Sequence, residues 1–193
     1  TWIDITPTGV NASICDLEIS STSASGRLHM TTGIGSTQTY RYTDIPSTVS
    51  SGAGWNAPTT PFPSYNERCE MAIMGNVLYA CPVNNATNNV PTIYKTIDGG
   101  DNWIATASQP NGGNWANGQG WYSLSAAINP SNTNEFICGG LDCYKTTNGG
   151  ASWTQISTWV GNSGQYVHAD QHNLQWWDGG NKLMFTCDGG VHF

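Results

Sequence analysis

The chain has 193 residues, enough for one domain with a sizeable hydrophobic core. Only 10% of the residues are charged and the formal net charge is −7, with six Lys and Arg residues scattered singly. This pattern excludes the basic surface that nucleic-acid binding requires, and no apolar run reaches the roughly 20 residues of a membrane-spanning helix. Because the sequence opens on Thr1, we expect a processed product or a fragment.

Four tryptophans, spaced about 50 residues apart, mark an internal repeat. They are Trp2, Trp55, Trp103 and Trp153. Between them lie short segments of β-forming residues separated by Gly, Asn and Ser turns, and no segment keeps the 3.6-residue period of a helix. The sequence therefore predicts an all-β fold. In chain order, the predicted strands are residues 14–19, 27–32 and 39–43; 69–74, 77–81 and 92–96; 123–128, 135–138 and 143–146; and 173–177, 183–187 and 191–193.

The repeat divides the chain into five segments. Residues 1–8 are assigned as the closing strand of a repeat, because Trp2-Ile3-Asp4-Ile5 is similar to Trp153-Thr154-Gln155-Ile156. Complete repeats follow at 9–63, 64–110 and 111–160, and a partial repeat at 161–193. Two interpretations of the last residues stay open: Asp188-Gly189-Gly190 is a hairpin turn, which we prefer, or residues 186–193 form a further copy of the turn motif described next.

The clearest motif occurs twice, 50 residues apart: Tyr94-Lys95-Thr96-Ile97-Asp98-Gly99-Gly100-Asp101-Asn102-Trp103 returns as Tyr144-Lys145-Thr146-Thr147-Asn148-Gly149-Gly150-Ala151-Ser152-Trp153. Asp or Asn can accept hydrogen bonds from the backbone of its own turn, Gly adopts positive φ, and a buried Trp fixes the turn. We expect a structural role for the motif residues Thr96, Asp98, Gly100 and Trp103 and for their counterparts Thr146, Asn148, Gly150 and Trp153.

This pattern, Ser/Thr-x-Asp-x-Gly-x-x-Trp, resembles the Asp-box or BNR repeat of sialidases, sortilin-like receptors and xyloglucanase-like glycoside hydrolases. The chain also resembles propeller proteins exported by Bacteroidetes. The resemblance implies a β-propeller of four-stranded antiparallel blades, with about four blades present. Since Asp-box propellers generally carry six or more blades, we expect a part of a larger propeller, with closure as four blades as the alternative. Further blades or neighbouring subunits would cover the open sheets.

Six cysteines occur without any Cys-x-x-Cys pair, which argues against a zinc ribbon or a thioredoxin-like site. Cys138 and Cys143 flank a predicted hairpin, and Cys69 and Cys81 lie on strands joined by another. We predict two disulfides, Cys138–Cys143 and Cys69–Cys81, with buried free thiols as the alternative, and the sequence assigns no partner to the other two cysteines. Disulfides would favour an exported protein.

The string Tyr166-Val167-His168-Ala169-Asp170-Gln171-His172 is the strongest candidate for a functional site. With Trp121 and Tyr122 at the start of the preceding repeat, it resembles segments that enter the innermost strand of sortilin-like and xyloglucanase-like propellers, near the axis where ligands gather. The candidate ligand-binding residues are Trp121, Tyr122, Tyr166, His168, Asp170 and His172.

On an extended backbone, His168, Asp170 and His172 project to one face. They could hold a divalent metal or supply an acid and a base to a sugar, with Asp170 as the candidate catalytic acid, or form a hydrogen-bond network between blades. No other cofactor is expected. Sialidase chemistry is disfavoured because only three arginines are present for a sialate carboxylate.

The sequence favours a secreted or cell-surface binding and scaffold module, non-catalytic by itself, with a glycan or a cell-surface or matrix protein as partner. Membrane insertion is not expected. One alternative is a fragment of a xyloglucanase-type glycoside hydrolase, which needs two opposed carboxylates. The other is a subunit of a self-assembling extracellular filament.

Overall fold

The computed structural model describes residues 4–10, 13–24, 26–33, 38–44, 52–87, 90–161 and 165–193. They form four antiparallel sheets, each built from consecutive strands, which confirms the predicted all-β fold. The first sheet contains β1 (Ile14–Ser20), β2 (Arg27–Thr32) and β3 (Tyr40–Asp44). The second contains β4 (Cys69–Met74), β5 (Val77–Pro82), β6 (Tyr94–Thr96) and β7 (Ile104–Ala105); the third contains β8 (Ser125–Asn129), β9 (Asn132–Gly139), β10 (Cys143–Thr146) and β11 (Thr154–Gln155); the fourth contains β12 (Gln171–Trp177), β13 (Lys182–Cys187) and β14 (Gly190–His192). Three short 3-10 helices are η1 (Asn85–Thr87), η2 (Pro110–Gly113) and η3 (Asp178–Gly180).

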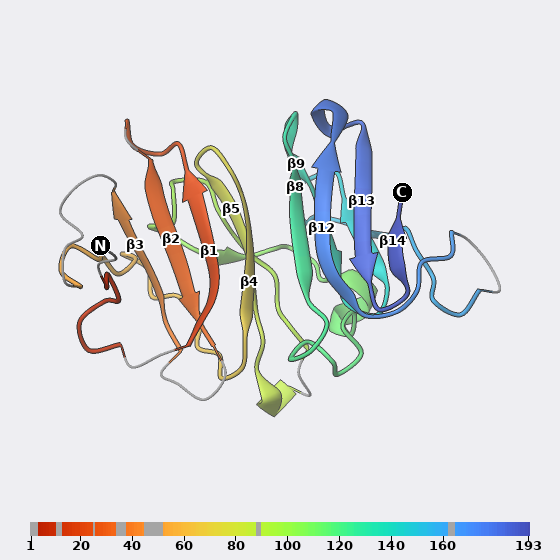
Figure 1. Cartoon of the computed structure of the whole chain (residues 1–193), viewed down its shortest axis with the longest axis horizontal. Coiled ribbons are helices and arrows are strands. Elements are labelled where there is room, and N and C mark those ends of the chain that lie inside the picture. Colours follow the sequence, from red (N-terminus) through yellow and green to blue (C-terminus); the bar gives the residue numbers. More distant parts are fainter. Residues whose placement is uncertain are drawn as a thin grey trace.

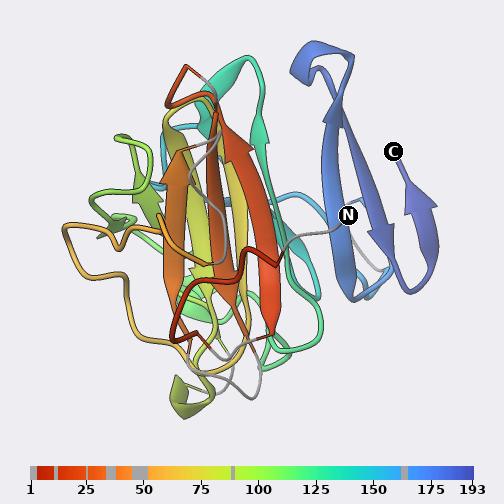
Figure 2. The same ribbon diagram turned by 60° about the vertical axis from the view of Figure 1, so that its left-hand side comes forward.

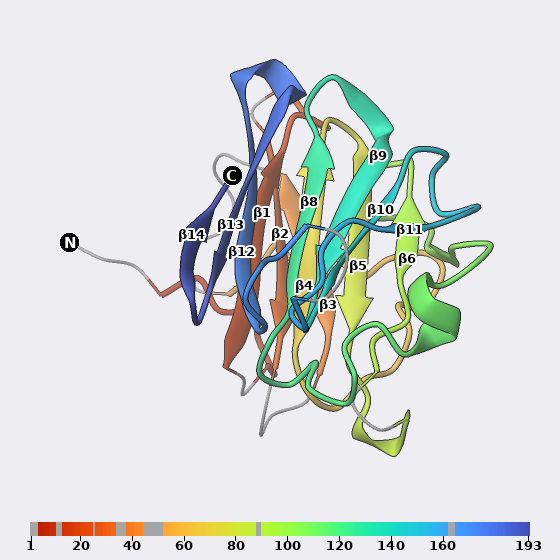
Figure 3. The ribbon, with the colours of Figure 1, turned by 90° about the vertical axis from the view of Figure 1, so that its right-hand side faces the viewer.

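The sheets stand next to one another in chain order, as the blades of a propeller do. The first strands of the sheets touch in sequence: β1 contacts β4, β4 contacts β8, and β8 contacts β12. In Figure 1 these four strands occupy the middle of the molecule, with β3 toward one side and β14 toward the other. Figure 2 shows the blue fourth sheet at one end of the row, and Figure 3 looks along the row from that end, so that the sheets overlap. The described residues contain no helix with the length and apolar character to cross a membrane.

Apolar side chains fill the space between each pair of consecutive sheets. Tyr40 and Met71 belong to the cluster between the first and second sheets. Tyr79 and Phe136, from the second and third sheets, stack with their ring centroids 4.3 Å apart. A third cluster joins the third and fourth sheets. Burying apolar area at about 25 cal/mol per Å² makes these interfaces the main stabilising contribution, since each sheet alone would expose both of its faces.

The turn between β6 and β7 is held by one carboxylate. Asp98 Oδ1 accepts hydrogen bonds from the backbone N–H groups of Asp101 and Asn102, at 3.1 and 3.0 Å. Gly100 has a φ of 98°, and a Cβ added there would lie 1.8 Å from the hydroxyl of Tyr40 in the neighbouring sheet. Glycine is therefore required both by the backbone conformation and by the close approach of the two sheets.

The equivalent turn between β10 and β11 has the same arrangement around an amide. Asn148 Oδ1 accepts from the backbone N–H groups of Ala151 and Ser152, at 3.1 and 2.9 Å. The hydroxyl of Thr146 donates to the same oxygen at 2.9 Å. Because the carbonyl oxygen alone makes these contacts, Asn148 can take the place that Asp98 has in the other turn.

The predicted Cys138–Cys143 disulfide is wrong. In the β9–β10 hairpin, Cys143 pairs with Gly139 and Cys138 pairs with Tyr144, so the two cysteines are offset by one position. A one-residue offset places two side chains on opposite faces of a sheet. Both thiols are free, and Cys138 lies in the core toward the second sheet while Cys143 lies in the core toward the fourth.

The predicted Cys69–Cys81 disulfide is wrong for the same reason. Cys69 pairs with Pro82, and Cys81 is again one position away from the opposed residue. The two side chains enter different cores, and both are free thiols. Cys15 and Cys187 are free as well, so the cysteines give no indication of an oxidising compartment.

A contact outside the named strands extends the first sheet beyond β3. Tyr42 of β3 forms an isolated antiparallel bridge with Asn56. Next to it, Trp55 Nε1 donates to the carbonyl oxygen of Ile5 at 2.7 Å, which ties the N-terminal segment to this sheet. Trp2 lies outside the described residues, and residues 4–8 are not part of a strand.

Candidate functional site

Three side chains from two sheets meet at the end of the propeller where the first strands begin. Tyr122 precedes β8, His172 is at the start of β12, and Asp188 lies in the turn between β13 and β14. His172 Nε2 is 2.6 Å from Asp188 Oδ1, and the hydroxyl of Tyr122 donates to Asp188 Oδ2 at 3.1 Å. The Tyr122 and His172 rings also meet edge to face, with centroids 5.2 Å apart. We call these three residues the carboxylate cluster.

Local folding explains why these residues meet. Cys187 pairs with Gly190, which confirms the hairpin interpretation of Asp188-Gly189-Gly190 and places Asp188 at its tip. The register of the β12–β13 pair shifts between Gln171 and Asn173, so His172 stands at an irregularity of the strand. The start of β12 and the end of β13 lie at the same end of the sheet because the two strands are antiparallel.

Hydrogen bonding sets the charge of the cluster. The hydrogen bond from His172 holds the pKa of Asp188 below its usual range, and the bond from Tyr122 acts in the same direction. The bond to Asp188 raises the pKa of Tyr122. At neutral pH the cluster therefore presents a carboxylate with neighbouring donors, and the side chains of Asp188 and His172 are 39% and 38% exposed.

Two further aromatic residues lie exposed near these segments. Trp121 is 49% exposed and its ring centroid lies 5.6 Å from that of Tyr122. Tyr166 is 50% exposed, and its ring lies 6.4 Å from that of His192. The sequence candidates Trp121, Tyr122 and His172 thus form one continuous group, while Tyr166 contacts a different histidine.

His168 and Asp170 do not align with His172 as predicted. β12 begins only at Gln171, and Asp170 has a φ of 66°, which breaks the alternation of an extended strand. His168 Nδ1 lies 3.1 Å from the carbonyl oxygen of Ala169. In the described part of the chain, no three His, Cys, Asp or Glu side chains are grouped to hold a metal ion, so the structure does not assemble the predicted metal ligands.

Buried polar atoms lie within two residues of the cluster along the chain. Ser123 Oγ, Asp170 Oδ1 and Gln171 Oε1 are buried and have no hydrogen-bond partner among the described residues. Ser123 follows Tyr122, and the other two immediately precede His172. Buried polar atoms are nearly always hydrogen-bonded, so these three atoms have hydrogen-bonding capacity that the described residues do not use.

A group of carboxylates lies beside this region, on β1 and β4. Asp16 Oδ2 accepts from the backbone N–H of Met71 at 2.6 Å, and Glu70 Oε2 is 2.8 Å from Arg68 Nη2. Arg68 Nη1 also donates to the carbonyl oxygen of Tyr122 at 3.0 Å. Arg68 therefore links Glu70 to Tyr122 of the carboxylate cluster.

Burial shifts the acidity of this group. It raises the pKa of Glu18 to about 7, and the charge of Asp16 adds to the shift. Burial also raises the pKa of Asp16 and of Glu70, and for Glu70 it outweighs the opposing effect of Arg68. Carboxyl groups that keep a proton near neutral pH are typical of general acids, although structural networks also produce them.

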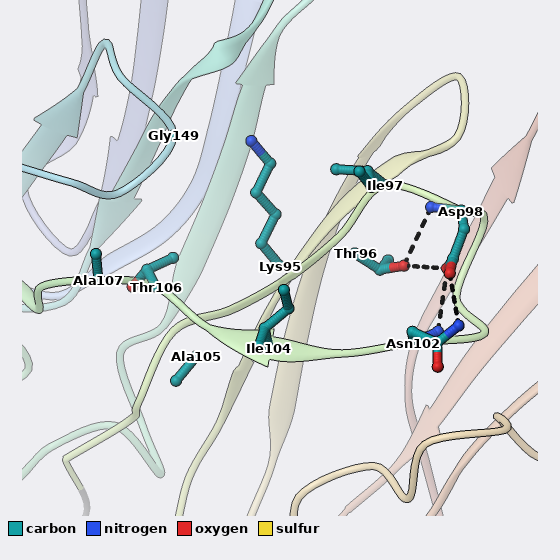
Figure 4. Close-up of a pocket in the computed structure, with 10 residues that line it drawn as sticks. All are labelled: Lys95, Thr96, Ile97, Asp98, Asn102, Ile104, Ala105, Thr106, Ala107 and Gly149. Carbon is teal, nitrogen blue, oxygen red and sulfur yellow. Dashed lines mark hydrogen bonds between the residues drawn. The ribbon is translucent and has the colours of Figure 1, made fainter.

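A separate pocket of about 230 Å³ lies at the outer rim, between the second and third sheets (Figure 4). Asp98, Ile104 and Gly149 are among the residues that line it. Lys95 crosses it and donates to Asn134 Oδ1 at 3.1 Å. Because Asp98 is occupied by the hydrogen bonds of its own turn, this pocket offers no free carboxylate.

Comparisons with known proteins bear on the fold. No protein-family model matches the chain, and no curated protein matches it significantly. Among solved structures, YCF48 from Cyanidioschyzon merolae aligns with 95% of the chain at a TM-score of 0.58 and 14% identity, and YCF48 bound to D1 peptide aligns with 93% at a TM-score of 0.55 and 14% identity. The GH74 enzyme of Niastella koreensis aligns with 97% at a TM-score of 0.58 and 15% identity.

The chain spans 52% and 48% of the two YCF48 chains and 28% of the GH74 enzyme. At these identities the likeness concerns the fold alone. The protein has an all-β fold of four antiparallel sheets arranged as part of a β-propeller.

Proposed function

We propose that this chain is a binding module that recognises a glycan through the carboxylate cluster and the adjacent Trp121, without catalysing a reaction by itself. The observation that carries the proposal is the hydrogen-bonded contact of Tyr122, His172 and Asp188 beside an exposed indole ring.

The chemistry of these groups suits a sugar. A sugar ring presents C–H groups on its faces and hydroxyls around its rim, so it packs on an aromatic ring while its hydroxyls meet a carboxylate and an imidazole. Trp121 and Tyr122 are 49% and 40% exposed, which leaves ring surface available for such packing. Because Tyr122 and His172 are already held by Asp188, little side-chain entropy is lost on binding.

The comparisons are compatible with a binding role but do not choose the ligand. One similar structure is of YCF48 bound to a peptide, and another is of a GH74 enzyme. Location outside the cell remains part of our proposal, supported only by the sequence resemblance. A protein ligand on a cell surface or in a matrix is the other partner class that the resemblance implies.

A glycan array with the purified chain tests the proposal. We expect binding to a defined set of neutral oligosaccharides, lost in Trp121→Ala and weakened about tenfold in His172→Ala. Trp159→Ala is the matched control, since Trp159 is 46% exposed but lies outside this group. Equal retention of binding by all three variants, or no binding by the correctly folded chain, would contradict the proposal.

A second candidate function is hydrolysis of a glycan, favoured by the grouping of Asp16, Glu18 and Glu70 on β1 and β4, where burial raises the pKa of each carboxyl group. Release of reducing sugar from xyloglucan or another β-glucan tests it. Turnover that disappears in Glu70→Gln, while Trp121→Ala lowers only the affinity, would establish catalysis. The absence of turnover together with glycan binding leaves the binding module as the function.

A further inference from the structure

The outer rim of the second sheet carries exposed apolar side chains at positions that are polar in the third sheet. Ile97 follows β6 and Ile104 begins β7, and they are 71% and 74% exposed. The corresponding residues, 50 positions later, are Thr147 and Thr154. Because the third sheet forms the same turn with threonine at both positions, the turn itself does not require isoleucine. Exposed apolar side chains that lie together are typical of interaction surfaces.

Lys95 lies beside these isoleucines and forms no ion pair with any carboxylate in the described part of the chain. It stands directly opposite Ile104 in the β6–β7 pair. Its Nζ donates to Asn134 Oδ1 at 3.1 Å and lies 5.1 Å from the centre of the Tyr79 ring. An ammonium group has three N–H donors, so Lys95 can donate to a further acceptor.

The third sheet shows the same lysine with a partner. Lys145, which corresponds to Lys95, has its Nζ 3.5 Å from Glu135 Oε1. By the registers of the two hairpins, Val77 takes the place of Glu135 in the second sheet. Burial lowers the pKa of Lys95, so its charged form lacks the stabilisation that a carboxylate gives. The second sheet therefore has the lysine but not the acid that balances it.

These residues border one pocket of about 230 Å³ between the second and third sheets (Figure 4). Gly149 closes the pocket toward the third sheet, and a Cβ there would lie 2.9 Å from Lys95 Nζ. Pockets for small molecules usually measure roughly 300–1,000 Å³, so this one suits a single side chain of a larger ligand. We call the pocket, with Lys95, Ile97 and Ile104 on its border, the rim site.

We infer that the rim site binds an extended segment of a partner protein in which an aliphatic side chain stands next to an aspartate or a glutamate. The aliphatic side chain fills the pocket against Ile97 and Ile104, and the carboxylate accepts a hydrogen bond from Lys95 Nζ. An apolar centre with polar contacts at its border is the usual composition of an interface between proteins.

The rim site is separate from the carboxylate cluster. It is built on β6, β7 and the turn after β10, which are outer elements of their sheets, whereas the cluster lies at the starts of the inner strands β8 and β12. Neither Trp121 nor any residue of the cluster lines the pocket. A partner protein and a glycan therefore occupy different surfaces, and the loss of one ligand leaves the other bound.

Selection of a random peptide library displayed on phage, against the purified chain, gives the first test. We expect the enriched peptides to share Leu, Ile or Val next to Asp or Glu. Lys95→Met and Ile104→Thr should each weaken binding of the best peptide about tenfold, measured by fluorescence polarisation. Lys145→Met is the matched control and should bind the peptide like the unchanged chain, because it removes a lysine that already has a carboxylate partner.

Exchange of the two charges gives the sharper test. Lys95→Glu should lose the acidic peptide and should bind the same peptide with lysine in place of its acidic residue. Urea denaturation of Lys95→Glu shows whether the variant is folded, and Ile104→Thr gives a second measurement, since the third turn already has threonine at that position.

Three results would overturn the inference. One is a library that yields no common sequence, or a common sequence without an acidic residue. Another is binding of the acidic peptide that Lys95→Glu and Ile104→Thr both leave unchanged. The third is displacement of the peptide by decanoate at equal concentration, which would identify a lipid as the ligand. Each result is read from peptide binding alone, so it is distinct from the outcome of the glycan array.

Discussion

His172 Nε2 lies 2.6 Å from Asp188 Oδ1, and this contact joins the start of β12 to the turn that follows β13. The same carboxylate accepts the hydroxyl of Tyr122 from the preceding sheet. Asp188 therefore fixes two aromatic rings that come from different blades. Removing it should release both rings together, whereas removing either ring alone leaves the other contact in place.

Asp188→Ala should weaken glycan binding about tenfold, because it removes the charged acceptor of two hydrogen bonds. Tyr122→Phe should weaken binding less, because it removes only one of them. The double variant should be no weaker than Asp188→Ala alone, since the tyrosine hydroxyl acts through the carboxylate. Calorimetric titration with the array-selected oligosaccharide measures all four affinities. Additive losses would show that Tyr122 and Asp188 contribute independently.

Asp98→Ala should lower the free energy of unfolding by about 1–2 kcal/mol, because it leaves the backbone N–H groups of Asp101 and Asn102 without their acceptor. Asp98→Asn should cost less than half of that, since Asn148 makes the same contacts in the other turn. Urea denaturation of the three proteins measures the difference. Equal losses for both substitutions would assign the effect to charge rather than to the acceptor oxygen.

The sequence predicted these turns well because their determinants are local. Asp98 and Asn148 contact groups only three and four residues away, so a short motif contains the whole interaction. The strands on either side also appear where expected, with small shifts at their ends. The Trp103 and Trp153 spacing then fixes the phase of the repeat.

Register and long-range contacts could not be read in this way. The error for Cys138 and Cys143 was a single position in the hairpin, which is enough to move a side chain to the other face. His172 was a candidate from its motif, but its partner Asp188 was assigned only to a turn. The Asp-Gly-Gly hairpin placed it at the correct end of the sheet, and no local pattern indicated that it would meet Tyr122 of the preceding repeat.

Six thiols should be titrated in the unfolded protein without any reductant, because all six cysteines are free. In the folded protein, Cys187 should react first and Cys15 next, since burial raises the pKa of Cys15 and the remaining cysteines, Cys69, Cys81, Cys138 and Cys143, are fully buried. Burial also raises the pKa of the Cys69, Cys81, Cys138 and Cys143 thiols, which lowers the fraction of reactive thiolate. Titration with a thiol reagent followed by intact-mass measurement counts them. If only four thiols react after unfolding, one of the predicted disulfides is present, and if only two react, both are present.

The contribution of Glu18 to stability should fall as the pH rises from about 4.5 to about 7, because burial raises the pKa of Glu18 to about 7 in the folded chain. Within this window the folded state holds a proton on Glu18 that the unfolded state has lost, so this contribution to the free energy of unfolding decreases with pH. Buried His29, whose pKa burial lowers to about 3, contributes in the opposite direction below about pH 6.5, so the effect of Glu18 is measured as the difference between the unchanged chain and a Glu18 variant. After allowance for solvent screening, the drop in the contribution of Glu18 is on the order of 1–2 kcal/mol.

Glu18→Gln should remove the contribution of Glu18 because the amide does not ionise, and Glu18→Gln combined with Glu70→Gln should also remove that of Glu70, whose pKa is likewise raised by burial. Leu17→Gln is the matched control: it alters the neighbouring exposed position of β1 without removing an ionisable group. Urea denaturation at pH 5, 6, 7 and 8 gives the free energy for each protein. A slope in Glu18→Gln as steep as that of the unchanged chain would mean that Glu18 ionises without cost, and that the contact between β1 and β4 tolerates its charge.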